Sequence, residues 1–393
     1  MLSFDQFHFR EPAKFTLIFS FAHKLLHVPV HAKPLFGFSV DLGEIQSIHG
    51  TEAEATFEVY KKSVLYKKNQ IVAQPDKHSY DVQSSCINNH ELCAFWAAIG
   101  ECTVNPNYMK LQCGPSCRTC HLIDINNRCP LDPNAIDALG PNDLDKMFLD
   151  VTNIYGPHKD YEPIVHSHPA GIDTSNIKYS DDPILDGPWV VTFENFHSFE
   201  ESDRLVHLGS EQGYERSTDV GERKPDGTYG VHESNTRTSS NAWCVDECYD
   251  DPLAQQVIQR IGNVTNINEI NHENLQLLKY DENQFYGEHH DYIPHHVDRQ
   301  CGPRILTFFL YLSDVEEGGA TRFPQLHASK GGLKINPKKG RALLWPSVVN
   351  SDPNKKDYRT NHEAMPVIKG RKYGANAWIH LRDFQTPNKS GCV

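Results

Sequence analysis

Apolar residues recur at helical spacing in two places in the C-terminal half of the chain. The first run covers 198–208 and opens with Ser198 and Glu201, the S-x-x-E pattern of a capped helix N-terminus. The second run begins after Asp251, where a proline occupies the first helical position, and reaches Gly262. The pattern therefore predicts two helices, the second ending at the glycine.

Strand-like runs follow the second helix and are separated by turn residues. They cover residues 275–280, 304–312, 342–345, 362–368 and 372–381. No helical pattern lies between them, which favours an antiparallel sandwich or jelly roll over a parallel α/β sheet. The run over 304–312 is apolar at odd and even positions alike, so we expect a central strand covered on both faces, with the two helices providing cover.

The N-terminal half has a different pattern. Residues 1 to about 80 show no sustained periodicity, and residues 121–185 are rich in Pro, Asp and Asn. That composition predicts an extended connector, interrupted by one short helix over 143–149. A chain of 393 residues exceeds what one hydrophobic core usually organises, so two folded units are expected. The net charge of −13, with no run of Lys or Arg, argues against nucleic acid as a partner.

Six of the eleven cysteines are crowded between Cys86 and Cys120. Their spacing lacks the two C-x-x-C pairs of a zinc site, so disulfides and an oxidising compartment are the favoured interpretation. Cys244 and Cys248 are close enough for a local disulfide, and the odd total leaves at least one thiol unpaired or intermolecular. The cysteines outside the cluster are Cys129, Cys244, Cys248, Cys301 and Cys392.

An oxidising compartment requires an export signal, and residues 1–32 are a candidate. An apolar stretch over 15–22 follows Arg10 and Lys14, and small residues suitable for cleavage end at Ala32. The stretch is shorter than the roughly 20 apolar residues that span a bilayer, so no stable membrane span is expected. A disordered leader is the alternative interpretation.

The strongest chemical signal is His289-x-Asp291 followed by a distant His362. Residues i and i+2 of an extended chain point the same way, so His289 and Asp291 can reach one ion, and a later strand can supply His362. Two imidazoles and one carboxylate are the ligand set of non-haem Fe(II) oxygenases. The other histidines that we considered, His295, His296 and His380, are interpreted as surface or structural residues.

Lys372 lies ten residues after His362, beyond a turn at Lys369-Gly370. In a regular strand it shares a face with Trp378, so both side chains can point into the barrel. A buried lysine needs an anion, and the distal carboxylate of 2-oxoglutarate would supply one. A solvent-facing lysine is the alternative.

In these motifs the sequence resembles the prolyl 4-hydroxylases of plants, algae and animal collagen biosynthesis. The likeness spans roughly 189–384. It includes Arg237-Thr238-Ser239, Tyr280, Tyr286, His289, Asp291, Arg304, Glu317-Gly318-Gly319-Ala320-Thr321, Phe323-Pro324, His362, Pro366-Val367, Gly370, Lys372 and Trp378. The sequence departs from the family at Asn283, where glycine is common, and at Tyr373, where tryptophan often follows the lysine.

This resemblance implies a role for each matched residue. His289, Asp291 and His362 would bind Fe(II), Lys372 would hold the distal carboxylate of 2-oxoglutarate, and Tyr280 would assist it. The matched positions Tyr286, Arg304 and Trp378 are associated with catalysis or peptide binding. By strand parity Arg304 and Thr307 point to opposite faces, so only one of them enters the barrel unless a bulge intervenes.

The cysteine cluster resembles an ShK-type domain, known from sea anemone toxins and from appendages of some prolyl hydroxylases. That family would pair Cys86 with Cys120, Cys93 with Cys113, and Cys102 with Cys117, whereas the sequence alone allows 15 pairings. Substrate or partner binding is the role that we favour for the module. A stable spacer is the alternative.

The prediction is a mainly β protein with flanking helices, in which a double-stranded β-helix (jelly roll) oxygenase domain follows a small disulfide-rich domain. The domains are a leader at 1–32, an undetermined segment at 33–85, the ShK-type domain at 86–120, a linker at 121–185 and the dioxygenase at 186–393. The expected activity is hydroxylation of peptidyl proline in the endoplasmic reticulum lumen or secretory pathway, with Fe(II), 2-oxoglutarate and ascorbate. The same chemistry on lysine or a small molecule, or an inactive binding scaffold, are the alternatives.

Overall fold

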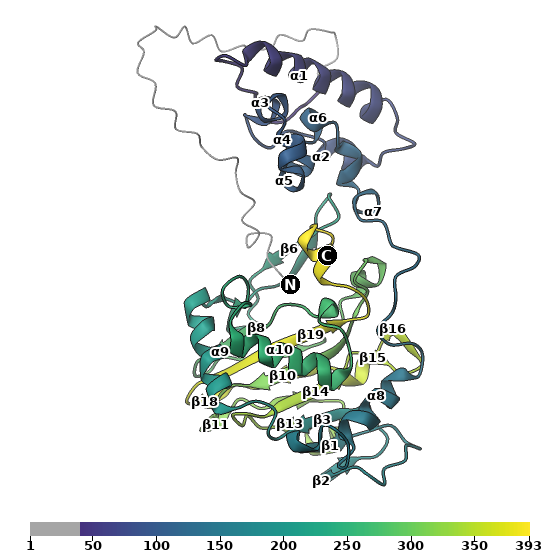
Figure 1. The fold of residues 1–393 in the computed structure, drawn as a ribbon, viewed down its shortest axis with the longest axis vertical. Helices are drawn as coiled ribbons and strands as arrows, with labels where there is room; N and C mark the ends of the chain where they lie inside the picture. The colour runs from purple at the N-terminus through teal and green to yellow at the C-terminus, as the bar shows by residue number, and fades with distance from the viewer. Residues whose placement is uncertain (1–39) are drawn as a thin grey trace. The chain divides into compact units, whose positions relative to one another are not determined.

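The computed structural model describes residues 40–393, which form two compact units (Figure 1). The first unit comprises the described residues up to Pro130 together with Glu222–Gly230, and the second comprises Leu131–Gly221 and Val231–Val393. The leader predicted at 1–32 lies outside the described residues. Within 40–393 no helix combines the length and apolar character needed to cross a bilayer.

The first unit is helical and held by disulfides. Its elements are α1 (Ala53–Tyr66), a π-helix (Lys67–Val72), α2 (Tyr80–Ser85), α3 (Cys93–Ala98), α4 (Glu101–Val104), α5 (Pro106–Gln112), α6 (Gly114–Cys117), a 3-10 helix (Cys120–Ile123) and α7 (Ile125–Arg128). The bonds Cys86–Cys120, Cys93–Cys113 and Cys102–Cys117 are those that the ShK resemblance implied. A segment this short buries little apolar surface, so the disulfides supply constraint that a larger core would otherwise provide.

The second unit is built on a nine-stranded sheet in the order β2-β1-β3-β14-β10-β19-β8-β7-β4. Along the chain these strands are β1 (Pro163–Ser167), β2 (Tyr179–Ile184), β3 (Val190–Phe193), β4 (Glu215–Arg216), β7 (Ser240–Trp243), β8 (Gln276–Tyr280), β10 (Arg304–Tyr311), β14 (Ala342–Pro346) and β19 (Lys372–His380). A four-stranded sheet, β13-β12-β17-β9, contains β9 (Tyr286–His289), β12 (Thr321–Phe323), β13 (Leu333–Ile335) and β17 (His362–Ala364). Three two-stranded ribbons pair β5 (Asp219–Arg223) with β6 (Tyr229–His232), β11 (Glu317–Gly318) with β18 (Val367–Lys369), and β15 (Val348–Val349) with β16 (Asp352–Lys356).

The central strand is β10, as its two-sided apolar pattern predicted. It pairs with β14 on one side and β19 on the other, and every one of its residues is buried. Phe309 and Tyr311 pack in a core with residues of the smaller sheet, while Phe308 and Leu310 pack in a core with the helices. The two sheets therefore enclose one core, and α9 and α10 lie over the outer face of the large sheet (Figure 1).

Two helices confirm their sequence signals, with one correction. Helix α9 (Phe199–Gln212) has the predicted capping box between Ser198 and Glu201. Helix α10 (Pro252–Thr265) begins after the predicted cap Asp251, but it runs through Gly262 instead of ending there. It ends where Asn266 adopts the left-handed conformation (φ 52°), which asparagine tolerates better than most residues.

The proline-rich segment 121–185 is more than a connector, which corrects the prediction. It contains α8 (Asp143–Thr152), where a short helix was expected, and the strands β1 and β2. Strand β1 pairs with β3 and extends the large sheet, so its backbone groups are satisfied by the fold instead of by water. The predicted strand over 362–368 is also divided, because β17 pairs with β9 and β12 whereas β18 pairs with β11.

Four of the five cysteines outside the 86–120 cluster are disulfide-bonded, and the fifth is free. Cys244 and Cys248 form a disulfide, Cys129 and Cys392 are also disulfide-bonded, and Cys301 is a buried free thiol.

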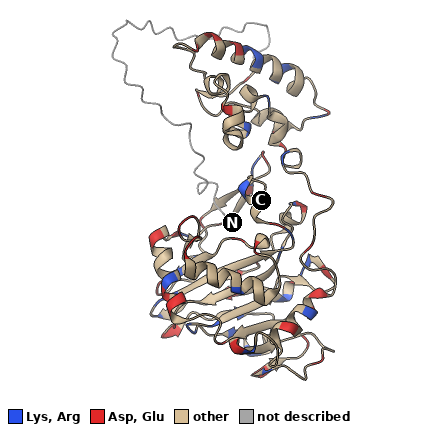
Figure 2. Cartoon of the chain, viewed as in Figure 1, with Lys and Arg blue, Asp and Glu red and all other residues tan. Residues whose placement is uncertain are grey.

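Lys and Arg are interspersed with Asp and Glu along both units (Figure 2). The C-terminal helix is α11 (Gln385–Lys389).

Candidate active site

The fold brings His289, Asp291 and His362 together. His289 ends β9 and His362 begins β17, and the two residues are direct partners across the antiparallel pair. Asp291 follows two residues after His289; its Oδ1 lies 3.8 Å from His289 Nε2, and its Oδ2 lies 3.5 Å from His362 Nε2. The three donor atoms can therefore converge on one ion.

Backbone carbonyls fix which nitrogen of each imidazole faces the site. His289 Nδ1 lies 2.8 Å from the carbonyl oxygen of Gly287, and His362 Nδ1 lies 3.0 Å from that of Thr360. Each carbonyl accepts a hydrogen bond, so the proton of the neutral ring resides on Nδ1 and the Nε2 lone pair is left for a metal. Burial lowers the pKa of His289 well below its ordinary value, with a further contribution from His362, which keeps this ring neutral.

Asp291 is the charged member of the cluster. Burial alone would raise its pKa, but the neighbouring His362, His289 and Arg304, together with a hydrogen bond from Thr307, hold the pKa well below its ordinary range. Thr307 Oγ1 donates to Asp291 Oδ2 over 2.6 Å. Two imidazoles and one oriented carboxylate fit Fe(II) with open positions for a chelating cosubstrate and oxygen.

Lys372 is buried in the same barrel and faces the smaller sheet. It is 1% exposed, and its Nζ has no hydrogen-bond partner among residues 40–393. The nitrogen lies 5.2 Å from the ring centroids of Tyr280 and Phe309 and 5.6 Å from that of Tyr311. Burial lowers the pKa of Lys372 to about 7. A buried ammonium without a partner is costly, and a bound anion such as a carboxylate of 2-oxoglutarate would offset that cost.

Tyr280 and Tyr286 occupy different sides of this site. Tyr280 is the cross-strand partner of Lys372, and burial raises the pKa of its hydroxyl. The Tyr286 ring stacks on His289 with centroids 3.6 Å apart, and its hydroxyl donates to Asp219 Oδ1 over 2.9 Å. Tyr280 is thus placed at the predicted anion pocket, and Tyr286 against a predicted iron ligand.

Arg304 reaches the barrel interior because β10 carries a bulge. Arg304 pairs with His380 and Leu306 pairs with Ile379, so one extra residue shifts the parity and brings Arg304 to the face of Thr307. Its guanidinium lies 3.7 Å over the ring of Trp378, the cross-strand partner of Thr307.

Arg304 forms a buried ion pair with the carboxylate of Glu273. Its Nε and Nη2 donate to the two oxygens of Glu273 over 2.5 and 3.0 Å, and Glu273 also accepts from His380 over 2.8 Å. The indole Nε1 of Trp378 has no hydrogen-bond partner within the described residues.

Several residues of the site were not identified from the sequence. Thr307 was considered only for its parity, and Asp219 and Glu273 were not considered. Arg237 belongs to the quoted family set without an assigned role, and its guanidinium lies 4.5 Å over the Tyr286 ring. The carboxylates carry no local motif, since each meets its partner across a long sequence separation, so no spacing rule could have found them.

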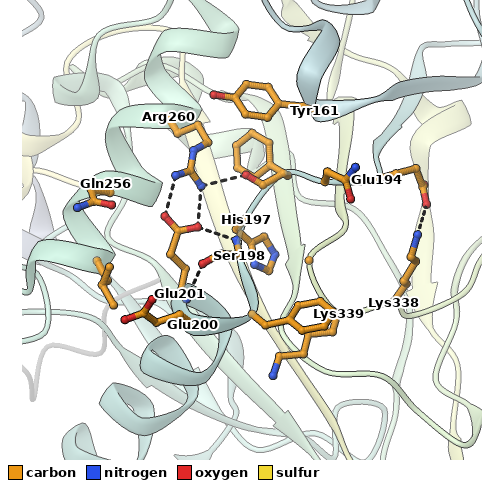
Figure 3. Close-up of a pocket in the computed structure, with 15 residues that line it drawn as sticks. Tyr161, Glu194, His197, Ser198, Glu200, Glu201, Gln256, Arg260, Lys338 and Lys339 are labelled. Atoms are coloured by element: carbon orange, nitrogen blue, oxygen red, sulfur yellow. Dashed lines mark hydrogen bonds and ion pairs between the residues drawn. The ribbon is translucent and has the colours of Figure 1, made fainter.

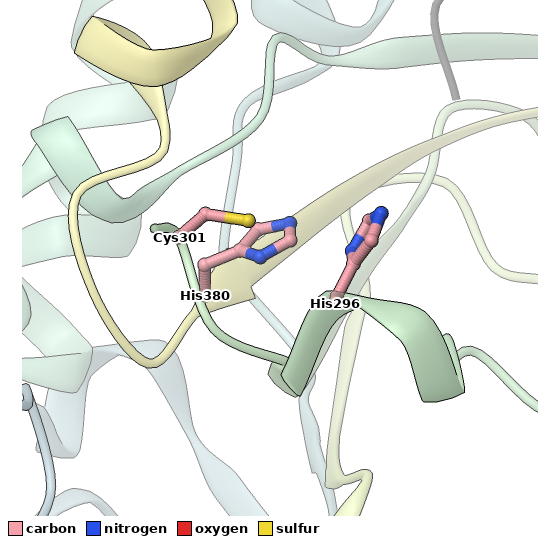
Figure 4. Close-up of side chains that lie close together, drawn as sticks. All are labelled: His296, Cys301 and His380. Atoms are coloured by element: carbon pink, nitrogen blue, oxygen red, sulfur yellow. The ribbon is translucent and has the colours of Figure 1, made fainter. Parts of the chain in front are cut away.

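A second cluster, His296, Cys301 and His380, brings three possible ligand atoms within 4.8 Å of one another (Figure 4). Both His380 nitrogens are already engaged, Nδ1 with the carbonyl of Gly302 at 2.8 Å and Nε2 with Glu273 at 2.8 Å. A metal would have to displace one of these bonds. The sequence indicated a surface or structural role for His296 and His380. Both are buried, so the structural interpretation holds and the surface interpretation is wrong for these two histidines.

A surface pocket lies elsewhere on the second unit, beside the first turn of α9 (Figure 3). Charged groups around it pair with each other: Arg260 binds Glu201 at 2.7 Å, and Lys338 binds Glu194 at 3.1 Å. None of the predicted site residues lines it. The predicted chemistry therefore belongs to the barrel interior.

Comparison with known proteins agrees with this geometry. Residues 275–380 match the 2OG-Fe(II) oxygenase superfamily model, and residues 85–120 match the ShK domain-like model. The chain is 32% identical to probable prolyl 4-hydroxylase 7 of Arabidopsis thaliana, over 52% of this chain and 67% of the relative. It is 34% identical to prolyl 4-hydroxylase subunit alpha-2 of Gallus gallus, over 50% of this chain but only 35% of the relative.

A solved structure, the viral collagen prolyl hydroxylase of Paramecium bursaria Chlorella virus 1 in complex with 2OG, is 26% identical. It covers 49% of this chain and 95% of its own, with a TM-score of 0.37. The sequence relationships establish the family. The chain belongs to the prolyl 4-hydroxylase family, as a 2-oxoglutarate-dependent dioxygenase that carries an ShK domain.

Proposed function

We propose that this enzyme hydroxylates prolyl residues of peptides or proteins at C4, consuming 2-oxoglutarate and O2 and releasing succinate and CO2. The observation that carries the proposal is a His-x-Asp…His cluster, with Asp291 and His362 buried, in one barrel with a buried lysine whose Nζ has no hydrogen-bond partner among residues 40–393. The first is a ligand set for Fe(II), and the second needs an anion. Bound iron supplies oxygen activation coupled to oxidative decarboxylation of the cosubstrate.

The residues of the chain act by binding and orienting. His289, Asp291 and His362 hold the metal, and Lys372 and Tyr280 hold the cosubstrate carboxylate. Tyr286 packs on a metal ligand, while Arg304 and Trp378 place a cation and an indole in the barrel interior, where they orient the bound peptide. The buried setting excludes water from reactive groups, which limits oxidation in the absence of substrate. Ascorbate would restore iron that is oxidised in turnovers without product.

We also propose that the enzyme works in the endoplasmic reticulum lumen or elsewhere in the secretory pathway. Three disulfides in the ShK domain and one at Cys244–Cys248 support this location, because such bonds persist in oxidising compartments. The net charge of −13 and the absence of a Lys/Arg run in the sequence favour a peptide over nucleic acid as the substrate.

The test is succinate release by the full chain with Fe(II), 2-oxoglutarate and ascorbate over paired peptides. Proline-rich and collagen-like peptides should stimulate release, and the same peptides with alanine in place of proline should not. Stimulation by lysine peptides or small molecules alone would reassign the substrate. No release with any of them would favour the scaffold alternative.

A further inference from the structure

Three residues of the second unit hold the Tyr286 side chain beside the candidate metal site. Its hydroxyl donates to Asp219 Oδ1 over 2.9 Å. Its ring stacks on His289, with centroids 3.6 Å apart, and the guanidinium carbon of Arg237 lies 4.5 Å from the ring centroid. The hydroxyl is thus fixed by a carboxylate, and the ring is packed by an imidazole and a cation.

Contacts within the second unit also set the position of Asp219. The amide of Ser217 donates to the carbonyl of Ser239 over 3.0 Å, and the Ser239 hydroxyl donates to Ser217 Oγ over 3.0 Å. Arg237 Nη1 donates to the carbonyl of Thr218 over 2.8 Å. The residues that lead into Asp219 are therefore attached to the segment that precedes β7, on the same unit as Tyr286.

Arg237 provides a counter-charge for the Asp219 carboxylate. Its Nη1 lies 3.7 Å from Asp219 Oδ1, and its Nη2 donates to Gln276 Oε1 on β8 over 3.3 Å. A hydrogen bond to a charged acceptor is stronger than one between neutral groups, so this carboxylate is a strong acceptor for the Tyr286 hydroxyl.

A tyrosine that is ordered before its ligand arrives spares binding the cost of ordering it. For one side chain that cost corresponds to roughly threefold to tenfold in affinity. The Tyr286 side chain is ordered in this way by Asp219, and it lies against a predicted iron ligand, where a peptide must reach the metal.

We propose that Asp219 is a positioning residue that fixes Tyr286 in the orientation in which it contacts the peptide, an inference that rests on the proposed function. Asp219 acts through its hydrogen bond to the Tyr286 hydroxyl, with Arg237 as its counter-charge. It is not itself a ligand of the metal or the cosubstrate.

Peptide kinetics of the iron-loaded full chain tests the proposal. Asp219→Val removes the acceptor and should raise the KM for a proline peptide by roughly threefold to tenfold. The kcat, the iron content and the KM for 2-oxoglutarate should stay within about twofold of the wild-type values, because strand pairing holds the metal ligands. Asp219→Asn keeps an oxygen that accepts, so its peptide KM should also stay within about twofold. Asp186→Val, at an exposed aspartate of the same unit, is the matched control.

A double-mutant cycle separates positioning from a general structural effect. Tyr286→Phe removes the hydroxyl and keeps the ring, so adding Asp219→Val to it should cause no further rise in peptide KM. The same rise in both backgrounds would overturn the proposal, as would an unchanged peptide KM in Asp219→Val. Circular dichroism checks the fold, and Asp219→Ala carries the test if the valine variant does not fold.

Nuclear magnetic resonance tests the contact without requiring activity. In protein labelled with 13C at tyrosine Cζ, the Tyr286 resonance is identified by its loss in Tyr286→Phe. It should move toward the position of free tyrosine in Asp219→Val and remain near the wild-type position in Asp219→Asn. An unmoved resonance in Asp219→Val would overturn the proposal. If the wild-type protein hydroxylates no proline peptide, the proposed function fails and the peptide role of Asp219 fails with it, whereas a moved resonance still supports the contact with Tyr286.

Discussion

His289 and His362 are direct register partners across β9 and β17, with ring centroids 4.4 Å apart. Strand pairing, and not loop conformation, sets the separation of the two imidazoles, and Asp291 joins them by following His289 at an interval of two. A site built on paired strands is held more precisely than one built on loops. The arrangement should therefore be present before metal binds.

Replacing any one of His289, Asp291 or His362 by alanine should abolish turnover and leave the fold largely intact. Each replacement leaves two protein donors, too few to hold Fe(II) against water. Iron content reports metal binding, succinate release reports turnover, and circular dichroism reports the fold. The control is His207→Ala, which replaces an exposed histidine on α9. Wild-type rate and iron content in any of the three would show that the ligand set is misassigned.

Thr307 orients Asp291 through the 2.6 Å hydrogen bond from its hydroxyl. Thr307→Val removes the donor at nearly constant volume and should weaken Fe(II) binding by roughly 10- to 100-fold, the usual effect of losing a residue that orients a metal ligand. Thr307→Ser keeps the donor and should bind iron much more tightly than the valine variant. Metal titration measures both, and equal affinities of the valine variant and wild type would contradict this role.

Lys372→Ala should raise the 2-oxoglutarate requirement while iron binding is nearly unchanged. Losing a charge-assisted contact costs on the order of 1.5 to 3 kcal/mol, a roughly tenfold to hundredfold rise in KM. Lys372→Arg should restore affinity only in part, because a planar fork does not fit a pocket shaped for an ammonium. The KM for 2-oxoglutarate at saturating peptide provides the measurement. An unchanged value in the alanine variant would remove Lys372 from the cosubstrate site.

The depressed pKa of Lys372 gives a pH dependence with a definite sign. Without the cosubstrate its pKa is about 7, so the amine is charged below that pH and neutral above it. A carboxylate binds the charged form, and binding above pH 7 must take up a proton. The KM for 2-oxoglutarate should therefore rise as pH increases above about 7, approaching tenfold per pH unit. In Lys372→Arg, whose side chain stays charged, this rise in KM should be absent. An equal rise in the wild-type protein and in Lys372→Arg would assign the pH dependence to another group.

Local patterns were sufficient for the strand predictions and for placing His289 and Asp291 near each other. Alternation placed His289 and Asp291 on one face, and the two-sided apolar run located β10 at the centre of the sheet. The departure at Asn283 also has a physical explanation, since its φ of +66° is a conformation that glycine and asparagine tolerate. Each of these features depends on residues close together in the sequence.

Features that depend on distant contacts were missed. The parity rule separated Arg304 from Thr307, and only the bulge beside Ile305 brings them to one face. Helix α1 was not predicted because two of its three buried positions are the polar residues Thr56 and Ser63, which hides the apolar period. Strand β1 was not predicted because prolines surround it. Its pairing partner, β3, also lies beyond a long loop, so no local pattern indicates the pairing.

Incorporation of oxygen from 18O2 into a proline peptide tests the central claim most directly. If the His289–Asp291–His362 cluster and Lys372 form a prolyl 4-hydroxylase site, one labelled atom should appear in 4-hydroxyproline and one in succinate, and both should be lost in Asp291→Ala. Labelled succinate with no hydroxyproline from any proline peptide would assign the chemistry to another substrate. The absence of label from both products in iron-loaded wild-type protein would contradict the account.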